Sequence, residues 1–288
     1  MTTSDQVRAI LEWHVMAGVD ETLSDAPVDR FADPPPPQAD AEPTPRAMND
    51  SQSPAPLARP APAPPPPTAA PTPPPSGEES VKTAVETAAA ATSLDELRAA
   101  LESFEGCGLR KTATNLVFAD GTAAARVLLI GEAPGAEEDR RGLPFVGPSG
   151  RLLDKMLASI GLQREDVLIS NTVFWRPPGN RTPTPQEAAI CMPFVERLVE
   201  LADPEVIVPL GGPAAKSLLG ETLGIGKLRG RWFSYATPKL SHPIDATPLF
   251  HPAYLLRTPG QKRAAWSDLR MIQGRLRERA ANRDGASD

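Results

Sequence analysis

Prolines are concentrated in one stretch of this chain, and that stretch is less able to fold than the segments on either side of it. Of the 288 residues, 35 are proline, and more than half of these lie between residues 27 and 75, in runs such as 34–37, 64–67 and 73–75. Such a stretch cannot bury enough apolar surface to offset the chain entropy that folding removes. We therefore expect residues 25–80 to form a disordered, Pro/Ala-rich linker with partial polyproline II character.

The segments on either side of this linker carry helical or globular patterns. Residues 1–24 place Val7, Ile10, Leu11, Val15 and Met16 at helical spacing, which predicts an amphipathic helix. This helix either docks on a protein partner or folds back on its own domain. Residues 93–280 are about the right length for a single hydrophobic core, and residues 281–288 are expected to be a flexible tail.

Charge and cysteine content limit the functional classes. The net charge is −6, but residues 1–105 hold 6 basic and 17 acidic side chains, whereas residues 106–288 hold 24 and 19. The basic second part is compatible with a polyanionic partner. Two cysteines indicate no disulfide framework, and the chain shows neither a secretory signal nor a membrane-spanning apolar run. We expect a cytoplasmic monomer without membrane contact.

Strand-like and helix-like patterns alternate from residue 93 onward. Ser93 and Glu96 have capping-box spacing, which predicts a helix to about residue 104. Apolar runs predict strands at 126–130, 167–170, 206–210 and 247–250, and helical spacing predicts helices at 150–160, 185–201, 213–219 and 261–279. This alternation predicts the α/β class, with a parallel sheet between two layers of helices.

Two loops stand out because each directly follows a predicted strand. Residues 131–139 combine two glycines with Glu132, Glu137, Glu138 and Asp139, and His251 follows the last strand. Loops at the carboxyl ends of parallel strands meet in one crevice, where ligands bind. The first loop has neither dinucleotide nor P-loop spacing. We expect an acid/base site formed by carboxylates and a histidine.

Three further features lie beside these loops. Phe145 could stack on a flat ring, although a phenylalanine is more often a core residue. Asn171 ends the second strand, and its amide can donate and accept hydrogen bonds at the same time, as a pyrimidine edge requires. Residues 176–181, with two arginines, form either a phosphate-binding loop or a solvated surface loop.

Together these motifs resemble family 4 uracil-DNA glycosylases. The resemblance spans about residues 106–276 and rests on Gly-Glu-Ala-Pro-Gly at 131–135, Pro-Phe-Val-Gly at 144–147, Asn171, residues 176–181 and His-Pro-Ala-Tyr-Leu-Leu-Arg at 251–257. It implies an α/β/α sandwich with a four-stranded parallel sheet. It also implies hydrolysis of the N-glycosidic bond of uracil in DNA, with the base flipped out of the duplex.

The resemblance implies roles for individual residues. Phe145 would stack on uracil, Asn171 would read its polar edge, and Ala133 would contact the base. His251 would donate to a uracil carbonyl oxygen as the base departs, while Glu132 and Glu138 would position water and favour the cationic sugar. The DNA-contacting residues would be Asn180, Arg181 and Arg257, together with Leu255 or Leu256 as a wedge in the gap left by the flipped nucleotide.

The cluster ligands are where the sequence departs from that family. Typical members hold a four-iron, four-sulfur cluster with four cysteines. Cys107 and Cys191 match two of them, but Phe104 and Trp175 occupy the other two positions. Neither of these side chains ligates iron. We therefore expect no cluster, and an apolar plug formed by these four residues in its place.

Two alternatives to a uracil-excising enzyme stay open. One is a non-catalytic DNA- or protein-binding module derived from the family, which the lost cluster ligands motivate. The other is a relative that traps its product covalently. That branch carries a basic insertion after the asparagine strand, and residues 176–185 contain no such insertion, so we disfavour it.

Overall fold

The computed structural model describes residues 77–284, so the N-terminal helix predicted at 1–24 lies outside the described residues. Helix α2 (Gly77–Ala90) begins inside the predicted linker, which is therefore wrong for residues 77–80. Helix α10 (Lys262–Asp284) likewise extends into the predicted tail at 281–288. No helix within residues 77–284 is long and apolar enough to cross a membrane.

A mixed sheet of six strands in the order β1-β3-β2-β4-β6-β5 forms the centre of the fold. Its four inner strands are parallel: β3 (Leu168–Asn171), β2 (Val127–Gly131), β4 (Val206–Pro209) and β6 (Ile244–Ala246). The predicted α/β class and the parallel centre are confirmed. The count of four strands is too low, because β1 (Ala119–Gly121) and β5 (Phe233–Tyr235) add short antiparallel edges.

The last parallel strand begins earlier than its sequence pattern indicates. We predicted a strand at 247–250, but β6 covers Ile244–Ala246. The chain stays extended beyond β6, where the backbone N–H groups of Thr247 and Leu249 donate to β4 carbonyls. Pro248 between them has no N–H to contribute, which limits the regular strand. This extended segment ends at His251 and so brings the histidine to the carboxyl edge of the sheet.

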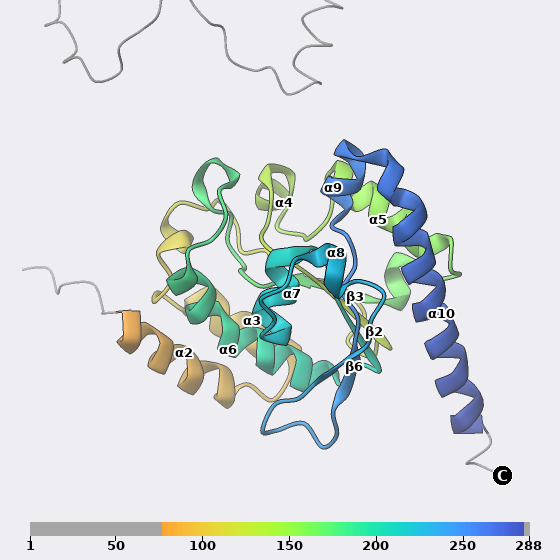
Figure 1. The fold of residues 1–288 in the computed structure, drawn as a ribbon. Coiled ribbons are helices and arrows are strands. Elements are labelled where there is room, and N and C mark those ends of the chain that lie inside the picture. The colour runs from red at the N-terminus through yellow and green to blue at the C-terminus, as the bar shows by residue number, and fades with distance from the viewer. Residues whose placement is uncertain (1–76, 285–288) are drawn as a thin grey trace, which may run out of the picture. The chain divides into compact units, whose positions relative to one another are not determined.

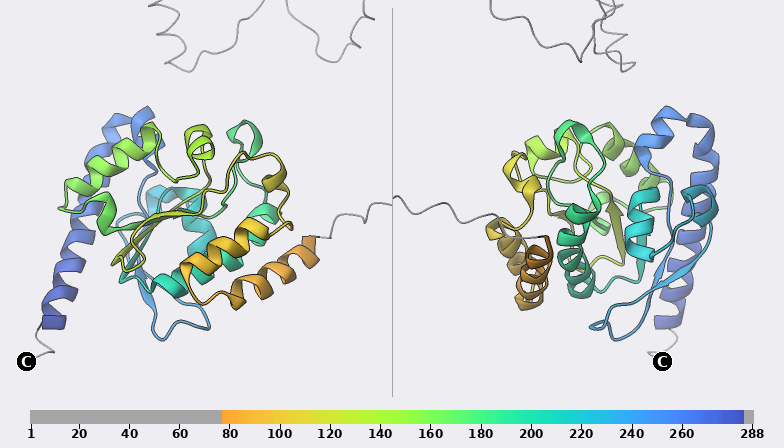
Figure 2. Two further views of the ribbon diagram at one scale, coloured as in Figure 1. Left: turned by 180° about the vertical axis from the view of Figure 1, so that it is seen from behind. Right: turned by 60° about the vertical axis from the view of Figure 1, so that its left-hand side comes forward.

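The two faces of the sheet are covered by different helices (Figures 1 and 2). Alternate residues of β2 point to opposite sides, so Leu128 and Ile130 pack in one core and Val127 and Leu129 in the other. The first core includes residues of α2, α3 (Leu94–Ser103) and α6 (Pro185–Ala202). The second includes residues of α5 (Pro148–Ala158), α9 (Pro252–Arg257) and α10. The architecture is the predicted α/β/α sandwich.

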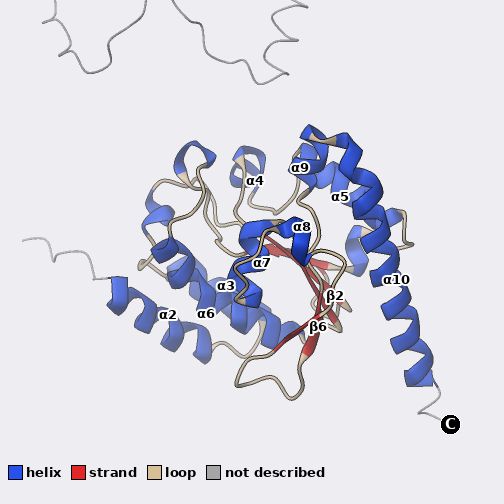
Figure 3. Ribbon diagram, in the orientation of Figure 1, coloured by secondary structure: helices blue, strands red, loops and turns tan. Residues whose placement is uncertain are grey.

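Local capping explains where several helices begin. The Ser93 hydroxyl accepts the Glu96 N–H at the start of α3, and Thr184 and Glu187 form a capping box at the start of α6. The predicted helices correspond to α3, α5, α6, α7 (Gly212–Leu219) and α10. The short helices α4 (Ala136–Arg141), α8 (Ile225–Leu228) and α9 were not predicted (Figure 3).

Candidate active site

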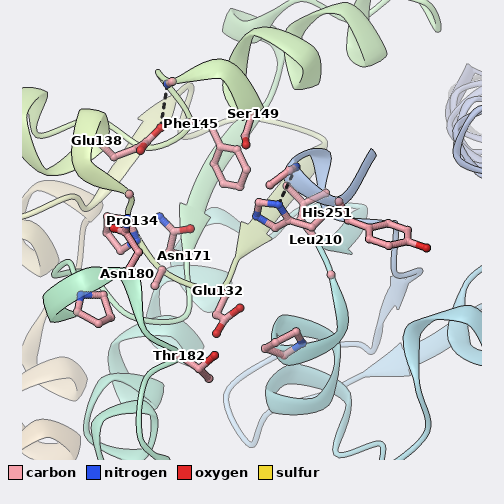
Figure 4. A pocket seen from close by; sticks show the side chains of 18 of the residues that line it. Glu132, Pro134, Glu138, Phe145, Ser149, Asn171, Asn180, Thr182, Leu210 and His251 are labelled. Atoms are coloured by element: carbon pink, nitrogen blue, oxygen red, sulfur yellow. Dashed lines mark hydrogen bonds between the residues drawn. The ribbon is translucent and has the colours of Figure 1, made fainter. Parts of the chain in front are cut away.

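A cleft of about 850 Å³ opens at the carboxyl edge of the parallel strands. It is lined by the segments that follow β2, β3 and β4 and by the segment between β6 and α9 (Figure 4). The structure thus brings nine of the eleven predicted site residues together: Glu132, Ala133, Glu138, Phe145, Asn171, Asn180, Arg181, His251 and Arg257. Leu255 and Leu256 do not line this cleft.

Phe145 and Asn171 meet over a glycine at the end of β2. A Cβ atom at Gly131 would lie 2.5 Å from the Asn171 Oδ1 atom and 2.7 Å from the Phe145 Cζ atom, so only glycine fits here. Phe145 itself has φ 52°, a left-handed conformation that costs a bulky residue about 1 kcal/mol or more. The surrounding loop holds this strained backbone in place, and the ring and the amide therefore share one wall of the cleft.

The Asn171 side chain is the most unusual polar group of the cleft. It is 1% exposed, yet neither Oδ1 nor Nδ2 has a hydrogen-bond partner among the described residues. A buried polar group without a partner costs about 1–3 kcal/mol, and native proteins tolerate few of them. The amide lies below the Phe145 ring in Figure 4, where it is positioned to pair with a ligand that both accepts and donates.

Glu132 lies near Asn171 with part of its carboxylate unsatisfied. Its Oε1 atom is buried and has no hydrogen-bond partner among the described residues. Burial raises the pKa of Glu132, and a hydrogen bond with the Thr182 side chain partly opposes this. A half-buried carboxylate with a raised pKa and a free oxygen can hold a water molecule and take its proton. Thr182 was not predicted as a site residue, since a lone threonine in a loop carries no pattern.

His251 is the N-cap of α9, and this fixes which ring nitrogen carries the proton. The Ala253 backbone N–H donates to the His251 Nδ1 atom at 3.1 Å, so a neutral ring carries its proton on Nε2. Burial, followed by the charge of Arg257, lowers the pKa of His251 to about 4, and Glu138 opposes these effects. At neutral pH the ring is therefore an uncharged hydrogen-bond donor.

The position of the His251 ring is set by close neighbours. Its centroid lies 5.6 Å from that of Phe145, at an interplanar angle of 31°. Gly211, with φ 93°, lies so close to the histidine that a Cβ atom at this position would be 3.1 Å from the His251 Cβ. The histidine, the phenylalanine and the asparagine consequently face one shared space.

Glu138 lies in the cleft wall but contacts the backbone rather than open space. Its Oε1 atom accepts N–H groups from Val146 at 3.0 Å and Gly147 at 2.9 Å. These bonds hold the loop that carries the strained Phe145. The geometry therefore gives Glu138 a supporting position, with one oxygen already committed to backbone donors.

The three polar residues predicted to contact DNA differ in their availability. Arg181 pairs with both carboxylate oxygens of Glu187, at 2.7 and 2.8 Å, and the Asn180 Oδ1 atom accepts a hydrogen bond from Arg176 at 2.8 Å. Arg257 is exposed and has no hydrogen-bond or ion-pair partner within residues 77–284. Arg257 is thus the cation most available to a phosphate.

Leu255 and Leu256, the two leucines predicted as alternative DNA wedges, differ in solvent exposure. Leu255 is 1% exposed and packs in the core beneath α9, so it cannot insert into DNA and that alternative is wrong. Leu256 is 42% exposed. On a helix, adjacent residues point about 100° apart, and sequence alone did not show which of the two faces the core.

Phe104, Cys107, Trp175 and Cys191 lie together in the core on the other face of the sheet. Both cysteines are buried free thiols that hydrogen-bond to one another, which raises the pKa of Cys191. The Phe104 ring packs edge-on against Phe194, with centroids 5.1 Å apart. The chain has two cysteines, both free, and two thiolates do not fit a cluster that takes four.

The fold and cleft define a class that comparison with known proteins makes explicit. Residues 118–270 match the family described as the uracil DNA glycosylase superfamily, and this stretch includes every segment that lines the cleft. The chain belongs to this superfamily.

Several named relatives are Type-4 uracil-DNA glycosylases. The Type-4 uracil-DNA glycosylase of Archaeoglobus fulgidus is 40% identical over 184 residues, which cover 62% of this chain and 92% of the relative. The Type-4 uracil-DNA glycosylase of Thermotoga maritima is 43% identical over 152 residues, which cover 52% of this chain and 77% of the relative. The Type-4 enzyme of Sulfurisphaera tokodaii is 37% identical over 186 residues, which cover 63% and 84%.

Proposed function

We propose that this protein is a uracil-DNA glycosylase, which hydrolyses the N-glycosidic bond of uracil in DNA and leaves an abasic site for repair. The observation that carries the proposal is the buried, unsatisfied amide of Asn171 beneath Phe145, with Glu132 and His251 lining the same cleft. The Type-4 uracil-DNA glycosylases that resemble this chain support it.

Uracil satisfies the groups that the cleft leaves unpaired. Its O4 atom accepts a hydrogen bond and its N3–H donates one, so a single base edge pairs with both the Nδ2 and the Oδ1 atoms of Asn171. The flat ring stacks on Phe145, and Ala133 lines the space beside it. Cytosine has a donor and an acceptor where uracil has the reverse, and an amide held in one orientation rejects it.

Departure of the base is assisted by the neutral imidazole. As the bond between the sugar and N1 breaks, negative charge develops on the uracil O2 atom, and the Nε2–H of His251 donates to it. Donors placed where charge develops contribute about 2.7–4 kcal/mol to lowering the barrier. The hydrogen bond from Ala253 to Nδ1 keeps the proton on the nitrogen that faces the cleft.

Glu132 activates water for the second half of the reaction. Its free Oε1 atom accepts a proton from a water molecule that adds to the sugar C1′ atom, and its charge stabilises the cationic sugar. The water proton and the uracil anion balance the hydrolysis, so the products are free uracil and an abasic sugar. Glu138 acts indirectly, by holding the loop of Phe145.

The exposed side chains beside the cleft indicate where the DNA runs. Arg257 neutralises a phosphate beside the flipped nucleotide, and Leu256 on the same helix fills the gap in the base stack. Asn180 and Arg181 stiffen the neighbouring loop through their own hydrogen bonds and contact the backbone at its edge.

We further propose that the enzyme works without an iron–sulfur cluster. The support is that the chain offers only two cysteines, both free and buried, and that Phe104 and Trp175 are buried in the same apolar core. Protein purified without added iron should lack the broad visible absorbance of such a cluster. Stoichiometric iron in that protein would contradict the proposal.

The deciding experiment is an excision assay. A uracil-containing oligonucleotide is incubated with the protein and then with alkali, which cleaves abasic sites. We expect strand cleavage for single- or double-stranded substrate and none for a control oligonucleotide that carries cytosine in place of uracil. Binding of both oligonucleotides without cleavage of either would favour the non-catalytic module instead.

Cytoplasmic location and the monomeric state stay predictions. Sedimentation tests the monomeric state.

A further inference from the structure

A second hollow of about 390 Å³ lies between α5, α9 and α10 and is separate from the cleft. Its floor is apolar, formed by Leu152, Met156, Leu255, Ala265 and Leu269. Trp266 stands at its edge and is 50% exposed. We refer to these residues and the cations around them as the α5–α10 groove. A tryptophan exposed beside such a floor marks a candidate interaction surface.

The border of the α5–α10 groove is positively charged. Lys155, Lys262 and Arg263 line it, all three are exposed, and no acidic residue lines it. Within residues 77–284 none of the three has an ion-pair partner. The Arg270 guanidinium adds a further cation 5.4 Å from the Trp266 ring centre. An apolar floor with a cationic border is complementary to an apolar side chain flanked by carboxylates.

We propose that the α5–α10 groove binds an acidic peptide segment of a partner protein, with a leucine or phenylalanine side chain seated on its floor. A nucleobase fits less well, because its polar edges would be buried against aliphatic groups and this costs free energy. The neutral polar side chain of the lining, Ser159, already donates to the Met156 carbonyl oxygen at 2.6 Å. Lysine and arginine ammonium and guanidinium groups pair with carboxylates at the border.

The short helix α9 separates this groove from the cleft. Leu255 faces the groove, whereas Ala253, Tyr254 and Arg257 line the cleft. A peptide in the groove therefore leaves the cleft open and holds the partner beside the DNA path. The inference is independent of the proposed glycosylase activity, because no groove residue is assigned a role in excision.

The test uses the full-length protein and a fluorescein-labelled peptide, Asp-Glu-Asp-Leu-Phe-Asp-Glu, followed by fluorescence anisotropy. We expect saturable binding that weakens as salt increases. Trp266→Ala and the double variant Lys262→Glu with Arg263→Glu should each weaken it about tenfold. Lys82→Glu, which reverses an exposed charge on α2, is the matched control and should bind normally. Thermal unfolding checks that every variant is folded.

Any of the following results would overturn the proposal. One is the absence of saturable binding, or equal binding of a peptide in which serine replaces Leu and Phe. Another is binding of a single-stranded oligonucleotide that Trp266→Ala abolishes while the acidic peptide fails to bind, which would assign the groove to nucleic acid. The third is a dimer in sedimentation that Trp266→Ala dissociates, which would assign it to a second copy of the chain.

Discussion

The cleft and the Phe104/Cys107/Trp175/Cys191 cluster lie on the same sheet but follow opposite rules. The cleft buries polar atoms of Glu132 and Asn171 that have no protein partner. The cluster encloses its two thiols in aromatic and aliphatic side chains, and the thiols satisfy each other. Stability is thus lost at the cleft and gained at the cluster.

This contrast indicates that the cleft residues serve function, whereas the residues of the Phe104/Cys107/Trp175/Cys191 cluster serve packing. Buried polar atoms without a protein partner are few in native proteins, and three of those in residues 77–284 belong to Glu132 and Asn171, which both line the cleft, so the cleft is suited to a polar ligand. Phe104 and Trp175, by contrast, are buried in the first core, where dense packing of apolar side chains contributes to stability. Substitutions in the cleft should therefore change rates, and substitutions in the cluster should change stability.

The largest expected effect is on stability, from Trp175→Ala. Trp175 is 2% exposed, and truncating a buried aromatic residue costs about 3–5 kcal/mol of unfolding free energy. Denaturant unfolding measures this loss. Trp266→Ala makes the same chemical change at a residue that is 50% exposed and should cost less than about 1 kcal/mol. Equal costs for the two variants would remove the evidence for a packed plug.

The next effect is on rate, from His251→Asn. Asparagine can still cap α9, but its shorter side chain carries no donor to the position of the His251 Nε2 atom, so single-turnover excision should slow about 10²–10³-fold. The unfolding free energy should stay within about 1 kcal/mol of the wild type. His242→Asn, at an exposed loop position, controls for loss of a histidine and should leave the rate unchanged. A wild-type rate for His251→Asn would refute its assigned role.

Asn171→Leu should raise the unfolding free energy of the protein and lower its excision rate. Leucine keeps the branching and the number of side-chain heavy atoms but removes the unsatisfied amide, so the protein should become up to about 1–3 kcal/mol more stable while excision is lost. The comparison requires unfolding and excision on the same preparation. A strongly destabilised variant would show that the amide has partners in the folded protein and would break the contrast with the cluster.

The smallest effect concerns pH. Glu132 acts as a carboxylate, and burial raises its pKa above the ordinary 4.5, so excision should weaken as the pH falls through that raised value. His251 becomes charged only near its pKa of about 4 and should produce no step at 6.5. The pH dependence of the single-turnover rate tests both statements. A step near 6.5 that His251→Asn removes would show that the ring titrates normally.

The sequence predicted the parts of the fold that local patterns encode. Apolar runs located three of the four parallel strands, β2, β3 and β4, and the capping-box spacing at Ser93 located the start of α3. The edge strands β1 and β5 were missed because three residues each carry too little pattern. Helix α2 was missed although its alanines favour a helix, and two of them, Ala84 and Ala88, are buried in the first core.

The site was predictable in membership but not in detail. Strand ends placed Glu132, Asn171 and His251 together, because parallel strands share one carboxyl edge. The hydrogen bonds of Glu138 to the Phe145 loop, and the burial of Leu255, depend on tertiary packing that no local pattern records. Those two details change roles: Glu138 supports a loop, and Leu256 is the exposed leucine.

We propose that the cleft excises uracil without an iron–sulfur cluster. The direct measurement is single-turnover uracil excision by purified wild-type protein, with iron determined in the same sample. The account predicts full excision by protein that contains essentially no iron. Activity that rises in proportion to bound iron, or no excision by iron-free protein, would contradict it.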